Sequence, residues 1–166
     1  MAMISRRAAA ISFILAAVAA GCASTPPGGD GASALVGSWR LVSFEAEAQG
    51  SASRTKPMGN APTGYLSFMK DGRMAVVITA EGRKPASSEQ ERAALLTSLV
   101  AYGGGYRVEG DKFITTVDVA SNPAFVGTEQ PRWYKIVGNT LQESSDWVRR
   151  VDGTTVRVFN TYERVK

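Results

Sequence analysis

Four pairs of turn-forming residues divide the C-terminal part of this 166-residue chain into short segments rich in apolar and β-branched residues. The pairs are Asp71-Gly72, Gly110-Asp111, Gly138-Asn139 and Asp152-Gly153. Glycine next to Asn or Asp between two apolar runs is a strong local signal for a β-hairpin. The chain is therefore expected to form an antiparallel sheet in which successive strands lie side by side.

The pattern predicts eight strands. They cover residues 37–45, 64–69, 73–79, 105–109, 112–119, 132–137, 140–147 and 154–165. Eight strands joined chiefly by short links predict an all-β fold, an up-and-down antiparallel barrel. The length and the strand count also permit a β-sandwich.

One segment between the third and fourth strands has a helical pattern instead. Ser88 is followed three residues later by Glu91, the spacing of a capping box. Leu95 and Leu96 fall on one face, and Gly103 provides a C-cap signal. We predict one inserted helix over residues 89–101 and expect its apolar face to cover one mouth of the barrel.

The N-terminus has the layout of a secretory signal. Arg6 and Arg7 precede an uncharged, mostly apolar run, Ala8–Ala20, which is short for a membrane span. The segment Val18–Cys22 resembles the lipobox of bacterial lipoproteins, which implies cleavage before Cys22 and acylation of that residue. The alternative is an ordinary signal that leaves a free thiol.

This reading divides the chain into three parts. Residues 1–21 form the signal peptide, 22–34 a flexible tether rich in small and turn-forming residues, and 35–166 the barrel domain. Ala23 stands where an aspartate would favour retention in the inner membrane. The expected location is the cell envelope, anchored by lipid to the outer membrane and facing the periplasm.

Composition excludes several classes of function. The net charge of +4 is too small to indicate nucleic-acid binding, and Arg6 and Arg7 leave with the signal. The chain has no histidine and a single cysteine, so the usual ligand sets of zinc, haem and iron–sulfur centres are missing. We expect no metal site and no cofactor.

The first strand opens with Gly37-x-Trp39, which resembles the G-x-W start of the lipocalins. If the barrel closes, the last strand runs antiparallel beside the first, and Arg164 reaches Trp39. This arrangement resembles that of the lipocalins, in which a C-terminal arginine packs across the tryptophan. The alternative is a buried tryptophan and an unrelated surface arginine.

Longer motifs resemble the bacterial lipocalin-like domain family over nearly all of residues 35–166. They are a G-Y-L…D-G-R-M hairpin (64–74), a Y-x-G-x-Y strand entry (102–106) and a W-V-G-T-E-Q segment (125–130). The sequence departs from the family at Phe125, where tryptophan is usual, and at Thr115-Thr116, where histidine is frequent. Any family role that requires histidine is therefore absent.

Strand alternation predicts the lining of the barrel. With Lys112 and Lys135 facing water, the side chains expected inside are Phe113, Thr115, Val117, Val119, Gln130, Arg132, Tyr134 and Ile136. With Arg164 facing inward, Val156, Val158, Asn160 and Tyr162 of the last strand are also expected inside. Of these, Thr115, Val117, Gln130, Arg132, Tyr134, Val158, Asn160 and Tyr162, with Tyr106, are the candidate ligand-binding residues. Arg132 could instead lie outside, paired with Asp118 or Glu129, and the tyrosines could be ordinary core residues.

An apolar interior with a few polar groups predicts a membrane-anchored module that binds or carries a small hydrophobic or amphipathic molecule. An alternative is an isomerase- or cyclase-type enzyme that uses Glu45, Glu143 or Asp118 as acid or base. Another is an envelope interaction protein with a filled barrel. No residue is nominated as catalytic.

Overall fold

A computed structural model describes residues 30–150 and 153–166 of the chain. Its elements in chain order are α1 (Asp30–Leu35), β1 (Gly37–Ala48), β2 (Arg54–Thr55), β3 (Thr63–Phe68), β4 (Arg73–Thr79), α2 (Glu89–Thr97), β5 (Leu99–Glu109), β6 (Lys112–Ala120), the 3-10 helix η1 (Pro123–Phe125), β7 (Glu129–Val137), β8 (Thr140–Ser145), β9 (Val148–Arg149) and β10 (Thr155–Arg164). The expected signal peptide and Cys22 lie outside the described residues. None of the helices in the described part is long and apolar enough to cross a membrane.

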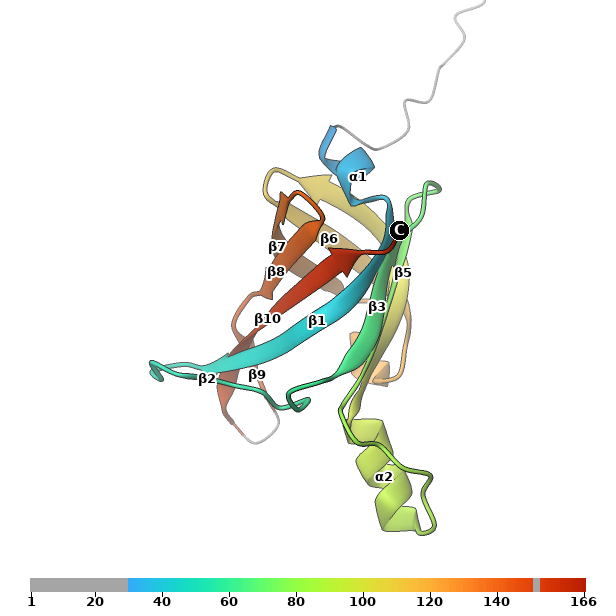
Figure 1. Ribbon diagram of the computed structural model, residues 1–166, viewed down its shortest axis with the longest axis vertical. Coiled ribbons are helices and arrows are strands. Elements are labelled where there is room, and N and C mark those ends of the chain that lie inside the picture. The colour runs from blue at the N-terminus through green and yellow to red at the C-terminus, as the bar shows by residue number, and fades with distance from the viewer. Residues whose placement is uncertain (1–29, 151–152) are drawn as a thin grey trace, which may run out of the picture.

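The strands form one antiparallel barrel (Figure 1). Eight strands follow each other around it, and the two-residue strands β2 and β9 pair antiparallel with one end of β1 and of β10. The barrel closes where β10 pairs with β1, in a register that runs from Trp39 opposite Arg164 to Ala48 opposite Val156. This confirms the predicted eight-stranded up-and-down barrel and excludes the sandwich.

Alternation along the strands supplies the core. In β4, Met74, Val76 and Ile78 point inward and are buried, while Ala75 and Val77 face outward. Large side chains from the other strands complete the same cluster: Trp39, Leu41, Phe44, Leu66, Phe68, Phe113, Val117, Leu141 and Tyr162. The core thus occupies the inside of the barrel.

Irregular pairing changes which residues face inward at two places. In β1 the register with β10 shifts between Leu41 and Ser43, and Val42 is exposed there. Between β5 and β6 the register shifts between Gly103 and Gly104, so that Val119 rather than Asp118 lies opposite Gly103. The prediction that Val119 faces inward is therefore wrong: the bulge reverses the alternation, and Val119 is 61% exposed.

Helix α2 begins where predicted and ends early. Ser88 and Glu91 form both hydrogen bonds of the capping box. The C-cap is Ser98, whose backbone N–H donates to the carbonyls of Ala94 and Leu96. Gly103 is therefore not the C-cap, because the chain joins β4 as strand β5 from Leu99 onward.

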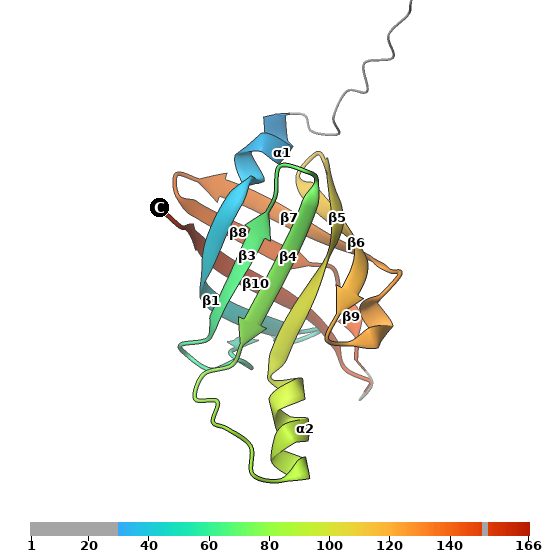
Figure 2. The same cartoon turned by 90° about the vertical axis from the view of Figure 1, so that its right-hand side faces the viewer.

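The expectation that α2 covers a barrel mouth is also wrong. The helix projects away from the barrel at the end opposite α1 (Figure 2). None of its residues is buried, and Leu96 is 58% exposed. The end of the barrel next to α2 is consequently left open by this helix.

Helix α1 covers the other end of the barrel (Figures 1 and 2). Ala32 and Leu35 are buried, and the carbonyl of Gly31 accepts a hydrogen bond of 3.5 Å from the Tyr134 hydroxyl. Residues 30–34, which the sequence assigned to the tether, thus form a helix packed on the barrel. The rest of the predicted tether lies outside the described residues.

Candidate ligand-binding site

The nine candidate ligand-binding residues share the inner face of the barrel. Thr115 of β6 lies between Tyr106 of β5 and Gln130 of β7, and paired residues project to the same side. Tyr134 of β7, Glu143 of β8 and Asn160 of β10 form a second inward row. Tyr106, Thr115, Val117, Asn160 and Tyr162 are buried, whereas Gln130, Arg132, Tyr134 and Val158 are half-buried.

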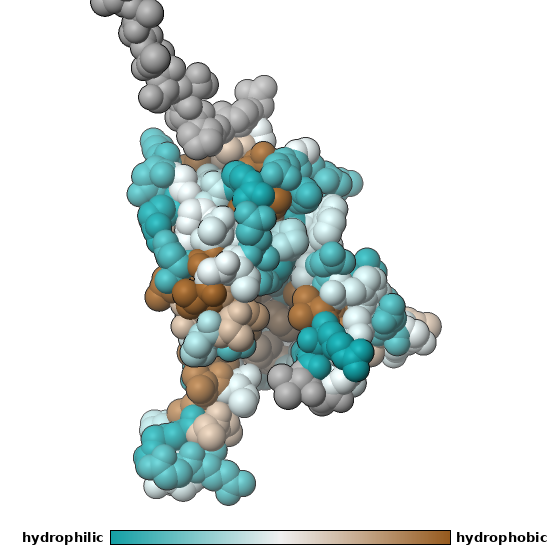
Figure 3. Space-filling view, turned by 180° about the vertical axis from the view of Figure 1, so that it is seen from behind, coloured by the Kyte–Doolittle hydropathy of each residue, from teal (hydrophilic) through white to brown (hydrophobic). Residues whose placement is uncertain are grey.

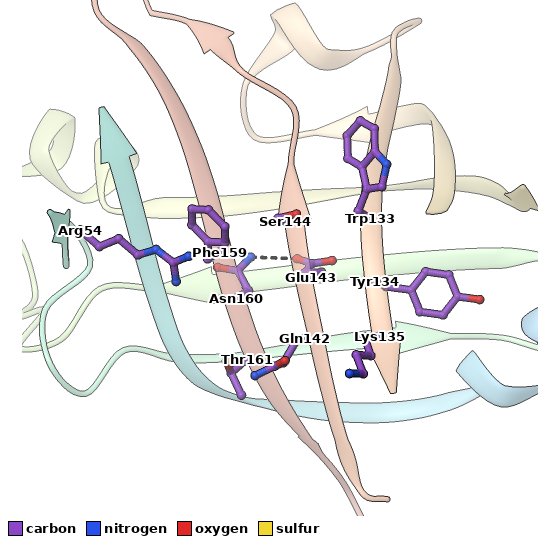
Figure 4. Close-up of a pocket in the computed structure, with 10 residues that line it drawn as sticks. All are labelled: Arg54, Trp133, Tyr134, Lys135, Gln142, Glu143, Ser144, Phe159, Asn160 and Thr161. Atoms are coloured by element: carbon purple, nitrogen blue, oxygen red, sulfur yellow. Dashed lines mark hydrogen bonds between the residues drawn. The ribbon is translucent and has the colours of Figure 1, made fainter. Parts of the chain in front are cut away.

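Three of these side chains make a hydrogen-bonded group. The Glu143 Oε1 atom accepts a hydrogen bond of 2.8 Å from Asn160 Nδ2 and one of 3.1 Å from the Tyr162 hydroxyl. Figure 4 shows the Glu143–Asn160 bond between neighbouring strands β8 and β10. Burial raises the pKa of Glu143, against the opposing effects of Arg132, Asn160 and Tyr162.

Arg132 brings a positive charge into this interior. Burial opposes that charge, but nearby Tyr102, Glu143 and Tyr162 outweigh it and raise the pKa of Arg132. Its Nη1 donates to the carbonyl of Pro131 at 2.8 Å. None of the ion pairs within 4.0 Å in the described ranges includes Arg132. The buried guanidinium therefore has no carboxylate in direct contact among the described residues.

Two buried polar atoms near this group have no hydrogen-bond partner among the residues that the structure describes. They are the Thr115 hydroxyl oxygen and the Asn160 Oδ1 atom. A buried polar atom without a partner costs about 1–3 kcal/mol, which a bound polar group can recover. Within the described part of the chain, the interior thus combines the Arg132 cation with a hydroxyl and an amide oxygen that are not hydrogen-bonded.

Apolar side chains surround these polar groups at the end of the barrel near α2. The Tyr102 and Phe125 rings meet edge to face with their centres 5.9 Å apart, and Val100 and Val158 are half-buried against the core. Seen from behind, the surface is hollowed between the base of α2 and the region of β9, with apolar residues beside the hollow (Figure 3). These apolar side chains therefore lie at the α2 end of the barrel, near the buried Arg132.

The opposite end is closed by the residues that the sequence assigned a structural role. The guanidinium of Arg164 lies over the buried Trp39 ring, 4.0 Å from its centre, and donates to the carbonyls of Val36 and Ala34. Gly37 has a φ of 128°, and an added Cβ would lie 3.1 Å from Arg164 Nη1. The contact expected from the resemblance to lipocalins is thus present.

The three carboxylates considered as acids or bases lie in two different places, outside and inside the barrel. Glu45 and Asp118 lie on the outer surface, paired with Arg54 at 3.2 Å and Arg73 at 2.8 Å. Only Glu143 of the three lies inside the barrel. Asp118 and Glu129, the outer partners considered for Arg132, form ion pairs with other arginines instead: Asp118 with Arg73, and Glu129 with Arg107.

Tyr102 was not among the sequence candidates, and Glu143 was considered only as an isolated carboxylate. Alternation in β8 contained the signal for Glu143, since Leu141, Glu143 and Ser145 are all buried on one side. The inward position of Tyr102 could not be predicted from alternation, because the predicted strand began at residue 105. No group of three Cys, Asp or Glu side chains suited to a metal ion occurs in the described ranges.

A comparison with protein-family models agrees with the barrel fold. A family model described as "Lipocalin-like domain" matches residues 36–164. The crystal structure of an uncharacterized protein from Bacteroides eggerthii DSM 20697 is similar over 78% of this chain and 98% of its own, at 12% identity and a TM-score of 0.39. No curated protein matches the sequence.

Proposed function

The chain belongs to the lipocalin-like domain family, and from this premise we propose that its barrel binds a small amphipathic molecule. The apolar part of the ligand lies among the side chains at the α2 end, and its polar end reaches Arg132. The observation that carries this proposal is the arginine itself, which lies inside a barrel and outside every ion pair of the described residues.

The interior gives the ligand a direction. A charge-assisted hydrogen bond to a guanidinium is about twice as strong as a neutral one, so an anionic end is favoured at Arg132. The Thr115 hydroxyl and Asn160 Oδ1, which are not hydrogen-bonded to other described residues, can supply further polar contacts. The half-buried Val100, Phe125 and Val158 offer apolar surface for a hydrocarbon part.

We further propose that the domain is a lipoprotein, acylated at Cys22 and held at the outer membrane on its periplasmic side. The support is the sequence alone: the basic start, the short apolar run and the small residues before the cysteine. Two or more acyl chains suffice for stable anchoring. A tethered barrel would then keep its ligand close to the membrane.

A fluorescent fatty acid, dansylaminoundecanoic acid, tests the binding proposal with residues 22–166 as the protein. Its emission is expected to rise and shift to the blue on binding, and the dansyl signal is preferred to tryptophan because Trp133 faces outward. Val158→Trp places a large ring among the residues at the α2 end and is expected to abolish the signal while circular dichroism is unchanged. Equal binding by this variant would place the probe on the surface and overturn the internal site.

A second function is favoured by one observation, the buried Glu143 with its raised pKa. A carboxyl group of this kind can act as a general acid. Its hydrogen bonds to Asn160 and Tyr162 also explain it as a structural member of the core. The enzyme would be established if the native protein converts a bound ligand and Glu143→Gln still binds that ligand but does not convert it. If the native protein does not bind the probe at all, a filled barrel that acts through its surface would be favoured.

A further inference from the structure

The outer face of β7, β8 and β10 carries a hollow of about 330 Å³ (Figure 4). This volume lies at the lower end of the range of small-molecule sites, about 300–1,000 Å³. Tyr134, Glu143 and Asn160 also line the hollow, but the buried side chains of Glu143 and Asn160 point into the barrel beneath this face. The hollow and the interior site therefore lie on opposite faces of the same strands.

Two aromatic residues stand on either side of a small one. Trp133 is paired with Ser144, and Ser144 with Phe159, so the three lie in one row across the three strands. Strands are about 4.8 Å apart, which places the backbones of Trp133 and Phe159 about 10 Å from each other. Ser144 forms the floor between two walls, and Trp133 is 37% exposed.

Hydrogen-bonding side chains surround this row. The next row across the same strands consists of Lys135, Gln142 and Thr161. On the other side, the Arg54 guanidinium lies over the Phe159 ring at 3.5 Å from its centre. Each wall or edge of the hollow thus presents either an aromatic surface or a polar group.

The charge of Arg54 at the edge of the hollow is largely compensated. Arg54 forms ion pairs with Glu45 at 3.2 Å and with Glu47 at 3.9 Å. A strongly anionic ligand would have to compete with these carboxylates. A neutral ligand with many hydroxyl groups meets donors and acceptors without that competition.

We propose that this hollow binds a pyranose ring of a saccharide chain. A sugar ring has one apolar face of C–H groups, which packs on an aromatic side chain, and a rim of hydroxyl groups, which the surrounding polar side chains can hold. The hollow is open to solvent on the outer surface, so a ring within a longer chain can enter it.

Two other occupants fit less well. An extended peptide needs a free strand edge for backbone pairing, but β7, β8 and β10 each have a neighbour on both sides. A lipid tail needs a continuous apolar surface, whereas polar side chains separate and surround the two aromatic residues here.

The test uses four soluble tetrasaccharides, those of glucose in β-1,4 and α-1,4 linkage, of mannose and of N-acetylglucosamine. Each is titrated to millimolar concentration into ¹⁵N-labelled protein (residues 22–166), and backbone amide and indole N–H shifts are followed by NMR. At least one sugar is expected to shift the Trp133 indole and the amides of β7 and β8. If no sugar does so, or if the shifts map elsewhere, the proposal is wrong.

Two variants and two controls sharpen the result. Trp133→Ala removes one wall, Ser144→Leu fills the floor, and each is expected to weaken sugar binding at least tenfold. Tyr65→Ala removes another exposed aromatic side chain, on β3, and should change nothing. Val158→Trp, which blocks the interior site, should also leave sugar binding intact, so failure of one site does not decide the other. Unchanged affinity in Trp133→Ala and Ser144→Leu would overturn the proposal.

Discussion

The guanidinium carbon of Arg164 lies 4.0 Å from the centre of the Trp39 ring, across the seam where β10 meets β1. Trp39 is fully buried, and its indole N–H donates to the Leu35 carbonyl at 2.8 Å. Arg164 also donates hydrogen bonds to the carbonyl of Ala34 in α1 and to that of Val36, which links α1 to β1. The pair therefore joins the first strand, the last strand and the helix that closes this end.

Trp39→Ala is expected to reduce the free energy of unfolding by about 3–5 kcal/mol, as for other buried aromatic residues. Arg164→Ala should cost less. Because the side chains touch, the double variant should lose less than the sum of the two single losses. Urea unfolding of the three variants measures the coupling, and strict additivity would show that the contact contributes nothing.

Gly104 and Gly105 are adjacent in β5 but differ in their surroundings. A Cβ at Gly104 would lie 1.9 Å from the Thr116 carbonyl oxygen, whereas one at Gly105 meets nothing within 4 Å. Gly104→Ala is therefore expected to destabilise the barrel by about 3 kcal/mol or more, and Gly105→Ala to have little effect. Equal thermal stability of the two variants would contradict the close approach of β5 and β6.

The raised pKa of Glu143 predicts a pH dependence of stability. Burial, the largest cause, lifts this pKa above its ordinary value of 4.5, so the folded protein holds the proton more tightly than the unfolded chain. The resulting stabilisation is complete below that value and is lost as the pH rises through the folded pKa. Glu143→Gln keeps an oxygen acceptor and cannot ionise, so its stability relative to the native protein should increase with pH.

Glu129→Gln is the matched control of opposite sign. Hydrogen bonds from Arg107 lower the pKa of Glu129 in the folded protein. The contribution of Glu129 to the free energy of unfolding is therefore present above the pKa that this group has in the unfolded chain, and it is lost as the pH falls through the folded pKa. Urea unfolding of both variants from pH 4 to pH 8 should give differences from the native protein that move in opposite directions. A pH-independent difference for Glu143→Gln would show that this carboxyl group has the same pKa in both states.

Cys22→Ser tests the proposed lipid anchor. No other residue near the expected cleavage site offers a thiol, so the variant should remain an unprocessed precursor without acyl mass. Detergent partitioning and intact mass of the protein from a bacterial host measure this. A serine variant that partitions into detergent and carries the same acyl mass would refute the lipoprotein proposal.

Local patterns predicted most of the fold because hairpin turns and alternation are properties of neighbouring residues. The turn pairs located the hairpins, and alternation placed Arg132, Asn160 and Tyr162 inside the barrel. The closing pair of Trp39 and Arg164 followed from strand direction alone once the barrel was assumed.

Features set by contacts distant in sequence could not be predicted in this way. The end of α2 depends on pairing of Leu99 with Thr79, and the outward turn of Val119 depends on the bulge opposite Gly103 and Gly104. The role of Glu143 likewise depends on partners from another strand. The sequence shows each residue, but only the barrel brings the partners together.

The most direct test of the binding account compares dansylaminoundecanoic acid with its methyl ester, in the native protein and in Arg132→Gln. The two probes share the same apolar part, and only the acid carries a charge for Arg132. The native protein should bind the acid more tightly, and because a charged hydrogen bond is worth about 1.5–3 kcal/mol, Arg132→Gln should reduce the preference by about tenfold or more. Equal affinities of the native protein for acid and ester, or the same preference in both proteins, would contradict the placement of the ligand's polar end at Arg132.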